Sequence, residues 1–197
     1  MRVYLFLIGC KVRVVGHEYM SAPGPRMLVS NHTSYFDVLV LMGVLGVEYH
    51  FVAKREVHDM PFVGTFLRKL GHFAFDRSDP QARAQQAAEM EEALRKGESV
   101  FVFPEGTFTR QQGVRPFQLG AFKAAVAAGC PIVPVALKGT RKFLPEGSLL
   151  PRPTSVLITI CQPMEARPGT TEEWRELVRL RDAARKSIAR ESGEPLL

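Results

Sequence analysis

The stretch Asn31-His-Thr-Ser-Tyr-Phe-Asp37 decides the architecture around it, because it joins two apolar segments. Residues 27–30 before it predict a buried strand, and residues 38–47 after it predict a buried helix. A histidine at the carboxyl end of a strand, with a carboxylate five residues later, is typical of a general base and its orienting group. The two side chains can meet at about 3 Å if His32 lies in the loop and Asp37 in the first helical turn.

The same stretch has a purely structural interpretation. Ser34-x-x-Asp37 has the form of a capping box, and Asp37 would then only face the positive end of the helix. His32 would be a hydrogen-bonded loop residue. The stretch alone does not choose between catalysis and capping.

Outward from this stretch, apolar runs alternate between the strand and helix patterns. Strands are predicted at residues 12–15, 27–29, 49–53, 73–75, 100–103, 131–137 and 155–160, and helices at 38–47, 59–70, 80–96 and 117–128. Thr170-x-x-Glu173 predicts the start of an amphipathic helix that carries Trp174, Leu177 and Ile188. Pro134 inside its strand predicts an edge strand or an irregular ladder. The fold class is therefore α/β, with a mixed, largely parallel central sheet flanked by helices.

The basic residues are unevenly placed. Between residues 106 and 168 there are eight lysines and arginines but two acids, which accounts for the whole net charge of +6. A basic face attracts phosphates of nucleic acids, anionic lipids or phosphorylated cofactors. Aromatic and basic residues do not interleave as they do in nucleic-acid-binding proteins, so we expect no nucleic-acid partner.

Other residue patterns exclude several classes of site. The three cysteines, Cys10, Cys130 and Cys161, form no disulfide framework, so we expect small core residues and a reducing compartment. The histidines lack the spacing of a zinc site. Residues 3–8 are apolar but far short of the roughly 20 residues that span a bilayer.

Charged and polar residues follow several predicted strands at one edge of the sheet. Besides His32, strand ends carry Lys54, Arg77 and the segment Glu105–Arg110. Ligands of open α/β sheets bind beyond the carboxyl ends of the strands. We therefore expect an acid–base pair and several cations at one rim.

Four ordered blocks resemble those of the glycerolipid acyltransferases, the group that contains the bacterial 1-acylglycerol-3-phosphate acyltransferases. They are Asn31–Asp37, which resembles the N-H-x-x-x-x-D box, Gly71–Arg77, Phe103–Arg110, which resembles F-P-E-G-[TS]-R-[ST], and the apolar Cys130–Val135. In the third block Phe108 stands where the family has arginine, and Arg110 follows two residues later. The resemblance covers residues 27–140 and implies a glycerol-3-phosphate acyltransferase-like domain.

The family moves a fatty acyl group from acyl-CoA or acyl carrier protein to a glycerolipid hydroxyl. The resemblance implies that this chain acylates lysophosphatidic acid to phosphatidic acid in phospholipid biosynthesis. His32 would be the general base and Asp37 its orienting group. The acceptor would be held by the substrate-binding residues Lys54, Arg77, Glu105, Gly106, Thr107 and Arg110, with main-chain N–H groups near Gly106 or at the helix start facing the oxyanion. No metal or cofactor is implied.

Lipid substrates imply a membrane surface as a partner. Residues 3–8 and 62–70 are candidates for it, with the core as the alternative. We expect one domain over residues 1–197 that lacks a membrane anchor or is part of a longer fusion, and that acts at the cytoplasmic face of the membrane, peripherally or through an anchor absent here. The alternatives are another lysophospholipid or glycerol-3-phosphate as acceptor, and a non-catalytic module that binds anionic lipid.

Overall fold

A computed structural model describes residues 9–34, 36–45, 49–54, 73–75, 80–107, 111–143, 152–167 and 173–197. The elements in chain order are β1 (Cys10–Val15), η1 (His17–Met20), β2 (Met27–Ser30), α2 (Phe36–Val44), β3 (Tyr49–Lys54), β4 (Phe73–Phe75), α5 (Pro80–Arg95), β5 (Ser99–Val102), α6 (Gly120–Ala128), β6 (Ile132–Lys138), α7 (Thr140–Phe143), β7 (Thr154–Ile160) and α8 (Glu173–Ser192).

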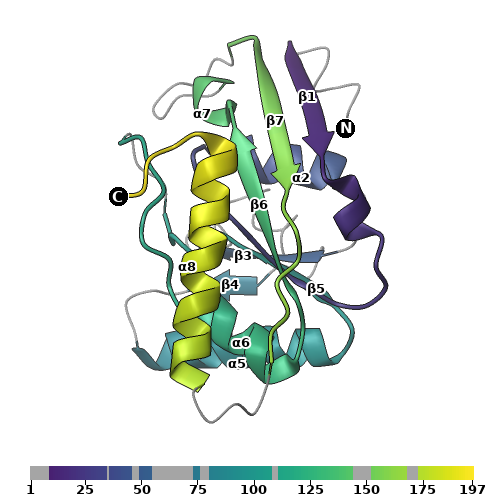
Figure 1. Ribbon diagram of the computed structural model, residues 1–197, viewed down its shortest axis with the longest axis vertical. Coiled ribbons are helices and arrows are strands. Elements are labelled where there is room, and N and C mark those ends of the chain that lie inside the picture. The colour runs from purple at the N-terminus through teal and green to yellow at the C-terminus, as the bar shows by residue number, and fades with distance from the viewer. Residues whose placement is uncertain are drawn as a thin grey trace.

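These strands form one sheet in the order β1-β7-β6-β2-β5-β3-β4 (Figure 1). Every neighbouring pair is parallel except β6 and β7, which are antiparallel. The predicted fold class, a mixed and largely parallel sheet with flanking helices, is confirmed. Because β2, β5, β3 and β4 are parallel neighbours, their carboxyl ends meet at one edge of the sheet.

Helices cover both faces of the sheet, as Figure 1 shows with α8 in front of β6 and α2 behind. Alternate residues of each inner strand enter two separate cores. Met27 and Val29 of β2 pack with side chains of α5, α6 and α8, whereas Leu28 packs with those of α2. Because residues 31–37 directly follow β2, they lie at the edge of the sheet where the carboxyl ends of the strands meet.

Of the two alternatives predicted from Pro134, the edge strand is wrong, because β6 lies between β2 and β7 in the sheet interior. The irregular ladder fits, because the antiparallel pairing with β7 ends at Val135. Pro134 lies opposite Val29 in the parallel ladder, while its carbonyl accepts the N–H of Cys161 at 2.8 Å. A strand residue directs its N–H and C=O to the same side. The nitrogen of Pro134, which carries no hydrogen, therefore faces β7. It lies just beyond Val135, where the antiparallel ladder between β6 and β7 ends, so no hydrogen bond between β6 and β2 is lost.

The helix predicted from residue 117 begins three residues later, at Gly120. The N–H of Gln118 instead bonds to the carbonyl of Pro104 at 2.9 Å, which ties this segment to the turn after β5. The helix ends at Gly129 as predicted, since a left-handed residue (φ 63°) closes it. In α8, Leu177 and Ile188 are buried as expected, but Trp174 is 66% exposed and lies off the apolar face.

All three cysteines are free and buried, as expected of core residues. Burial raises the pKa of the Cys161 thiol to about 11. Among the helices that the structure describes, none has both the length and the hydrophobicity of a membrane span. Residues 3–8 and the whole predicted helix at 59–70 lie outside the described residues, and of the second block only residues 73–75 are described.

Candidate active site

His32 and Asp37 meet at the carboxyl end of β2. Nδ1 of His32 lies 2.9 Å from Oδ2 of Asp37, so the contact predicted from their spacing is confirmed. Asp37 is fully buried in the first turn of α2, and the His32 side chain is 16% exposed. A carboxylate only accepts hydrogen bonds, so the neutral ring carries its proton on Nδ1 and has an unprotonated Nε2.

The capping interpretation also holds. Oδ2 of Asp37 accepts the main-chain N–H groups of Thr33 at 2.7 Å and Ser34 at 2.9 Å. The hydroxyl of Ser34 in turn accepts the N–H of Phe36 at 3.2 Å. The carboxylate of a capping box is therefore the same group that orients the imidazole.

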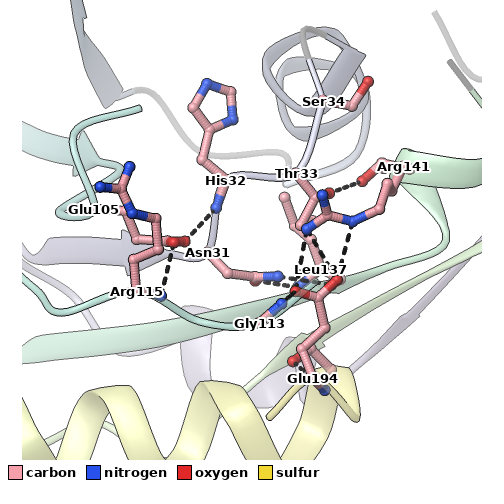
Figure 2. Close-up of polar contacts among 12 residues, drawn as sticks. Asn31, His32, Thr33, Ser34, Glu105, Gly113, Arg115, Leu137, Arg141 and Glu194 are labelled. Carbon is pink, nitrogen blue, oxygen red and sulfur yellow. Dashed lines mark hydrogen bonds and ion pairs between the residues drawn. The ribbon is translucent and has the colours of Figure 1, made fainter. Parts of the chain in front are cut away.

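Glu105 anchors the main chain of the same histidine. Its Oε1 accepts the N–H of His32 at 2.8 Å, and its Oε2 accepts the N–H of Arg115 at 2.9 Å (Figure 2). Burial raises the pKa of the Glu105 carboxyl, and these two N–H groups oppose that effect. Both carboxylate oxygens therefore accept hydrogen bonds from the main chain of the protein itself.

The imidazole is also held by an aromatic ring. Phe103, which directly follows β5, stacks on His32 with centroids 4.2 Å apart and planes 17° apart. In Figure 2 the imidazole of His32 points away from the backbone, on the opposite side from Glu194. Phe103 belongs to the third block of the resemblance, but no pattern in the sequence predicted that it would contact the histidine.

Asn31 joins the site to β6. Its amide donates to the carbonyl of Leu137 at 3.0 Å and accepts the N–H of Leu137 at 2.8 Å. Asn31 is 1% exposed, so this pair replaces two backbone bonds at the point where β2 leaves the ladder. A second link joins Thr33 to Thr140 of α7, whose hydroxyl oxygens lie 2.6 Å apart.

The predicted phosphate-binding cations fall mainly outside the described residues. Arg77 and Arg110 belong to that part, and of Lys54 only the backbone, at the end of β3, is described. The strand ends that precede them do share the edge that carries His32. The grouping of these cations around His32 remains a prediction.

Gly106 and Thr107 follow Glu105 in the turn after β5. The N–H of Gly106 bonds to the carbonyl of Phe103 at 2.9 Å, and Gly106 has φ +81°. At the helix start, the N–H of Asp37 bonds to the carbonyl of Ser34 at 3.1 Å. The N–H groups of Gly106 and Asp37 are therefore engaged within the protein in this conformation. Which N–H groups near them face the oxyanion remains a prediction.

Within the described residues, no three His, Cys, Asp or Glu side chains lie close enough to hold a metal ion. What the site does present is an oriented imidazole with its unprotonated nitrogen at the rim of the sheet. Such a group can take a proton from a hydroxyl that attacks a nearby carbonyl. This is the chemistry of acyl transfer to an alcohol.

Comparison with known proteins agrees with this chemistry. A family model described as Acyltransferase matches residues 11–138. The chain is 38% identical over 139 residues to the chloroplastic 1-acyl-sn-glycerol-3-phosphate acyltransferase BAT2 of Brassica napus, covering 70% of this chain and 40% of that protein. It is 32% identical over 135 residues to the 1-acyl-sn-glycerol-3-phosphate acyltransferase of Salmonella typhimurium, covering 68% and 55%. The chain thus spans about half the length of these relatives, or less.

The crystal structure of the 1-acyl-sn-glycerophosphate (LPA) acyltransferase PlsC from Thermotoga maritima superposes with a TM-score of 0.80 at 27% identity. The match covers 97% of this chain and 73% of that one. The structural match therefore covers nearly the whole chain, and the sequence matches cover about two thirds of it. The chain belongs to the acyltransferase family.

Proposed function

We propose that this chain transfers a fatty acyl group from acyl-CoA or acyl carrier protein to the free hydroxyl of lysophosphatidic acid, giving phosphatidic acid. The contact between His32 and Asp37 at 2.9 Å carries the proposal, because it supplies an oriented general base. The names of the relatives support the choice of acceptor.

In the proposed reaction, Nε2 of His32 takes the proton of the acceptor hydroxyl as its oxygen attacks the thioester carbonyl. Asp37 stabilises the imidazolium that forms. The tetrahedral intermediate then collapses with cleavage of the C–S bond, and the imidazolium returns the proton to the thiolate. The products are an ester and a free thiol, and His32 is regenerated. General-base assistance of this kind is worth about 10²–10⁴-fold in rate.

The remaining roles rest on the resemblance. Lys54, Arg77 and Arg110 would bind the phosphate of the acceptor, with arginine suited to a bidentate grip. Glu105 would contribute by fixing the backbone of His32, and Gly106 and Thr107 by lining the acceptor site. The scheme requires no metal or prosthetic group, because the imidazole itself accepts the proton. We place the reaction at the cytoplasmic face of a membrane, where the lipid acceptor lies.

The test is an acylation assay on the purified chain with a panel of acceptors, namely lysophosphatidic acid, other lysophospholipids and glycerol-3-phosphate, each offered acyl-CoA and acyl carrier protein. We expect lysophosphatidic acid to be acylated. Transfer only to another acceptor would refute the proposed substrate. Binding to anionic liposomes with no transfer to any acceptor would indicate the non-catalytic module instead.

The same assay tests the general base. His32→Ala should lower the rate by about 10²–10⁴-fold while the circular dichroism spectrum stays native. His17→Ala, at an exposed histidine of η1, is the matched control and should retain full activity. Full activity of His32→Ala would rule out the proposed role of His32.

A further inference from the structure

Glu194 lies just after α8, and its carboxylate joins two segments that are distant in sequence. Oε2 accepts the N–H of Gly113 at 2.9 Å. Arg141 of α7 donates from Nε at 3.3 Å and from Nη2 at 3.2 Å to Oε1, and from Nη2 at 3.2 Å to Oε2 (Figure 2). The Glu194 side chain is 12% exposed and that of Arg141 24%. A charge-assisted fork this far from solvent fixes geometry as well as adding energy.

The first of these contacts leads to His32 through Glu105. Gly113 is two residues from Arg115, whose N–H binds the carboxylate that also holds the N–H of His32. Arg185 of α8 supports the same loop, since it donates to the carbonyl oxygens of Val114 and Arg115 at 2.8 and 3.0 Å.

The residues after Glu194 run beside the same loop. The N–H of Val114 bonds to the carbonyl of Pro195 at 2.8 Å, and the N–H of Leu197 bonds to the carbonyl of Val114 at 3.1 Å. Gly113 has φ +137°, and a Cβ there would lie 2.5 Å from Cγ of Leu197. The positive φ favours glycine at this position, and any larger residue would also displace the Leu197 side chain.

The second contact leads to the site from the other side, through α7. Arg141 follows Thr140, whose hydroxyl lies 2.6 Å from that of Thr33. The N–H of Thr33 in turn bonds to Oδ2 of Asp37 at 2.7 Å. Two series of contacts that start at one carboxylate thus end on the two members of the catalytic pair, His32 and Asp37.

We propose that Glu194 is a positioning residue for acyl transfer, which holds the loop at residues 111–116 and α7 in the positions that place His32 against Asp37. This inference rests on the proposed function only for its effect on the rate. A displacement of about 1 Å in a catalytic group can cost about 10²-fold in rate, so small shifts at this distance have a measurable effect.

Three variants separate the two contacts. Glu194→Ala removes both, Arg141→Gln removes the fork to α7 while the bond to Gly113 stays, and Glu194→Gln keeps an acceptor for Gly113 but not the charge. We expect kcat to fall about tenfold or more in Glu194→Ala and less in the other two, with KM for both substrates within about twofold. Glu176→Gln is the matched control, because Glu176 also binds an arginine at 2.7 Å, but that partner, Arg179, lies three residues later on the same helix and is 58% exposed. It should leave kcat unchanged.

Amide hydrogen exchange tests the coupling without any substrate. In Glu194→Ala the N–H groups of Arg115 and His32 should exchange about tenfold faster or more, whereas those of β7 should not change. If all amides exchange faster together, the role of Glu194 is general stability and the proposal is overturned. It is also overturned if the His32 amide is unaffected, or if kcat is retained. If the native chain transfers no acyl group, the proposed function fails, while the exchange data still decide whether Glu194 positions His32.

Discussion

Oδ2 of Asp37 lies 2.9 Å from Nδ1 of His32 and also accepts two main-chain N–H groups at the start of α2. Capping and orientation of the imidazole are therefore one arrangement. The N–H groups of the helix start fix the carboxylate, and the fixed carboxylate selects the ring tautomer in which Nε2 is unprotonated and can act as a base.

Asp37→Asn should lower kcat by at least about tenfold, because an amide that donates to Nδ1 would favour the tautomer with the proton on Nε2. Steady-state kinetics with the acceptor identified by the panel measure this effect. Asp182→Asn, at an exposed aspartate of α8, is the control and should behave as the native chain. An unchanged rate in Asp37→Asn would leave Asp37 with the capping role alone.

Asn31→Ala should destabilise the fold, because it leaves the N–H and carbonyl of Leu137 unpaired in the interior. The free energy of unfolding should fall by about 2–5 kcal/mol, since each unpaired buried group costs about 1–3 kcal/mol. Denaturant unfolding followed by circular dichroism gives the value. Gln112→Ala, at an exposed amide, should change it by less than about 0.5 kcal/mol. If the free energy of unfolding of Asn31→Ala also falls by less than about 0.5 kcal/mol, water replaces the amide as the partner of Leu137.

The sequence predicted the sheet and the contact between His32 and Asp37 because both depend on short-range patterns. Strands and helices follow apolar periodicity, and five residues across a strand–helix turn bring the two side chains together. The position of Pro134 was not predictable in this way, because it depends on where the antiparallel ladder with β7 ends.

The contacts that hold the site in place were not predicted from the sequence, for a different reason. Glu105 binds the N–H of a residue 73 positions earlier, and Arg141 binds Glu194 53 positions later. A Glu-Gly-Thr turn and an isolated glutamate after a helix carry no local signal of such partners. Only the three-dimensional packing of the loop at residues 111–116 against the segment after α8 brings them together.

Arg77→Ala should chiefly raise KM for the lysophosphatidic acid acceptor, because the proposed role of Arg77 is to bind its phosphate. The KM for the thioester should change little. Initial rates measured with each substrate varied in turn separate the two constants. Arg83→Ala, at an exposed arginine of α5, controls for the loss of one positive charge. A change confined to the thioester's KM would place the phosphate site elsewhere.

The buried carboxyl of Glu105 should make stability depend on pH. Burial raises its pKa in the folded chain, so the native state holds this proton more tightly than the unfolded state, whose pKa is about 4.3. The resulting stabilisation is complete below that value and is lost as pH rises through the raised pKa. Glu105→Gln does not titrate there and serves as the reference. The free energy of unfolding of the native chain minus that of Glu105→Gln should therefore be larger at about pH 4 than at about pH 7. Denaturant unfolding of both chains across this range measures the difference, and Glu173→Gln, at an exposed site on α8, is the control. A difference that is constant or grows with pH would show that the two N–H bonds outweigh burial.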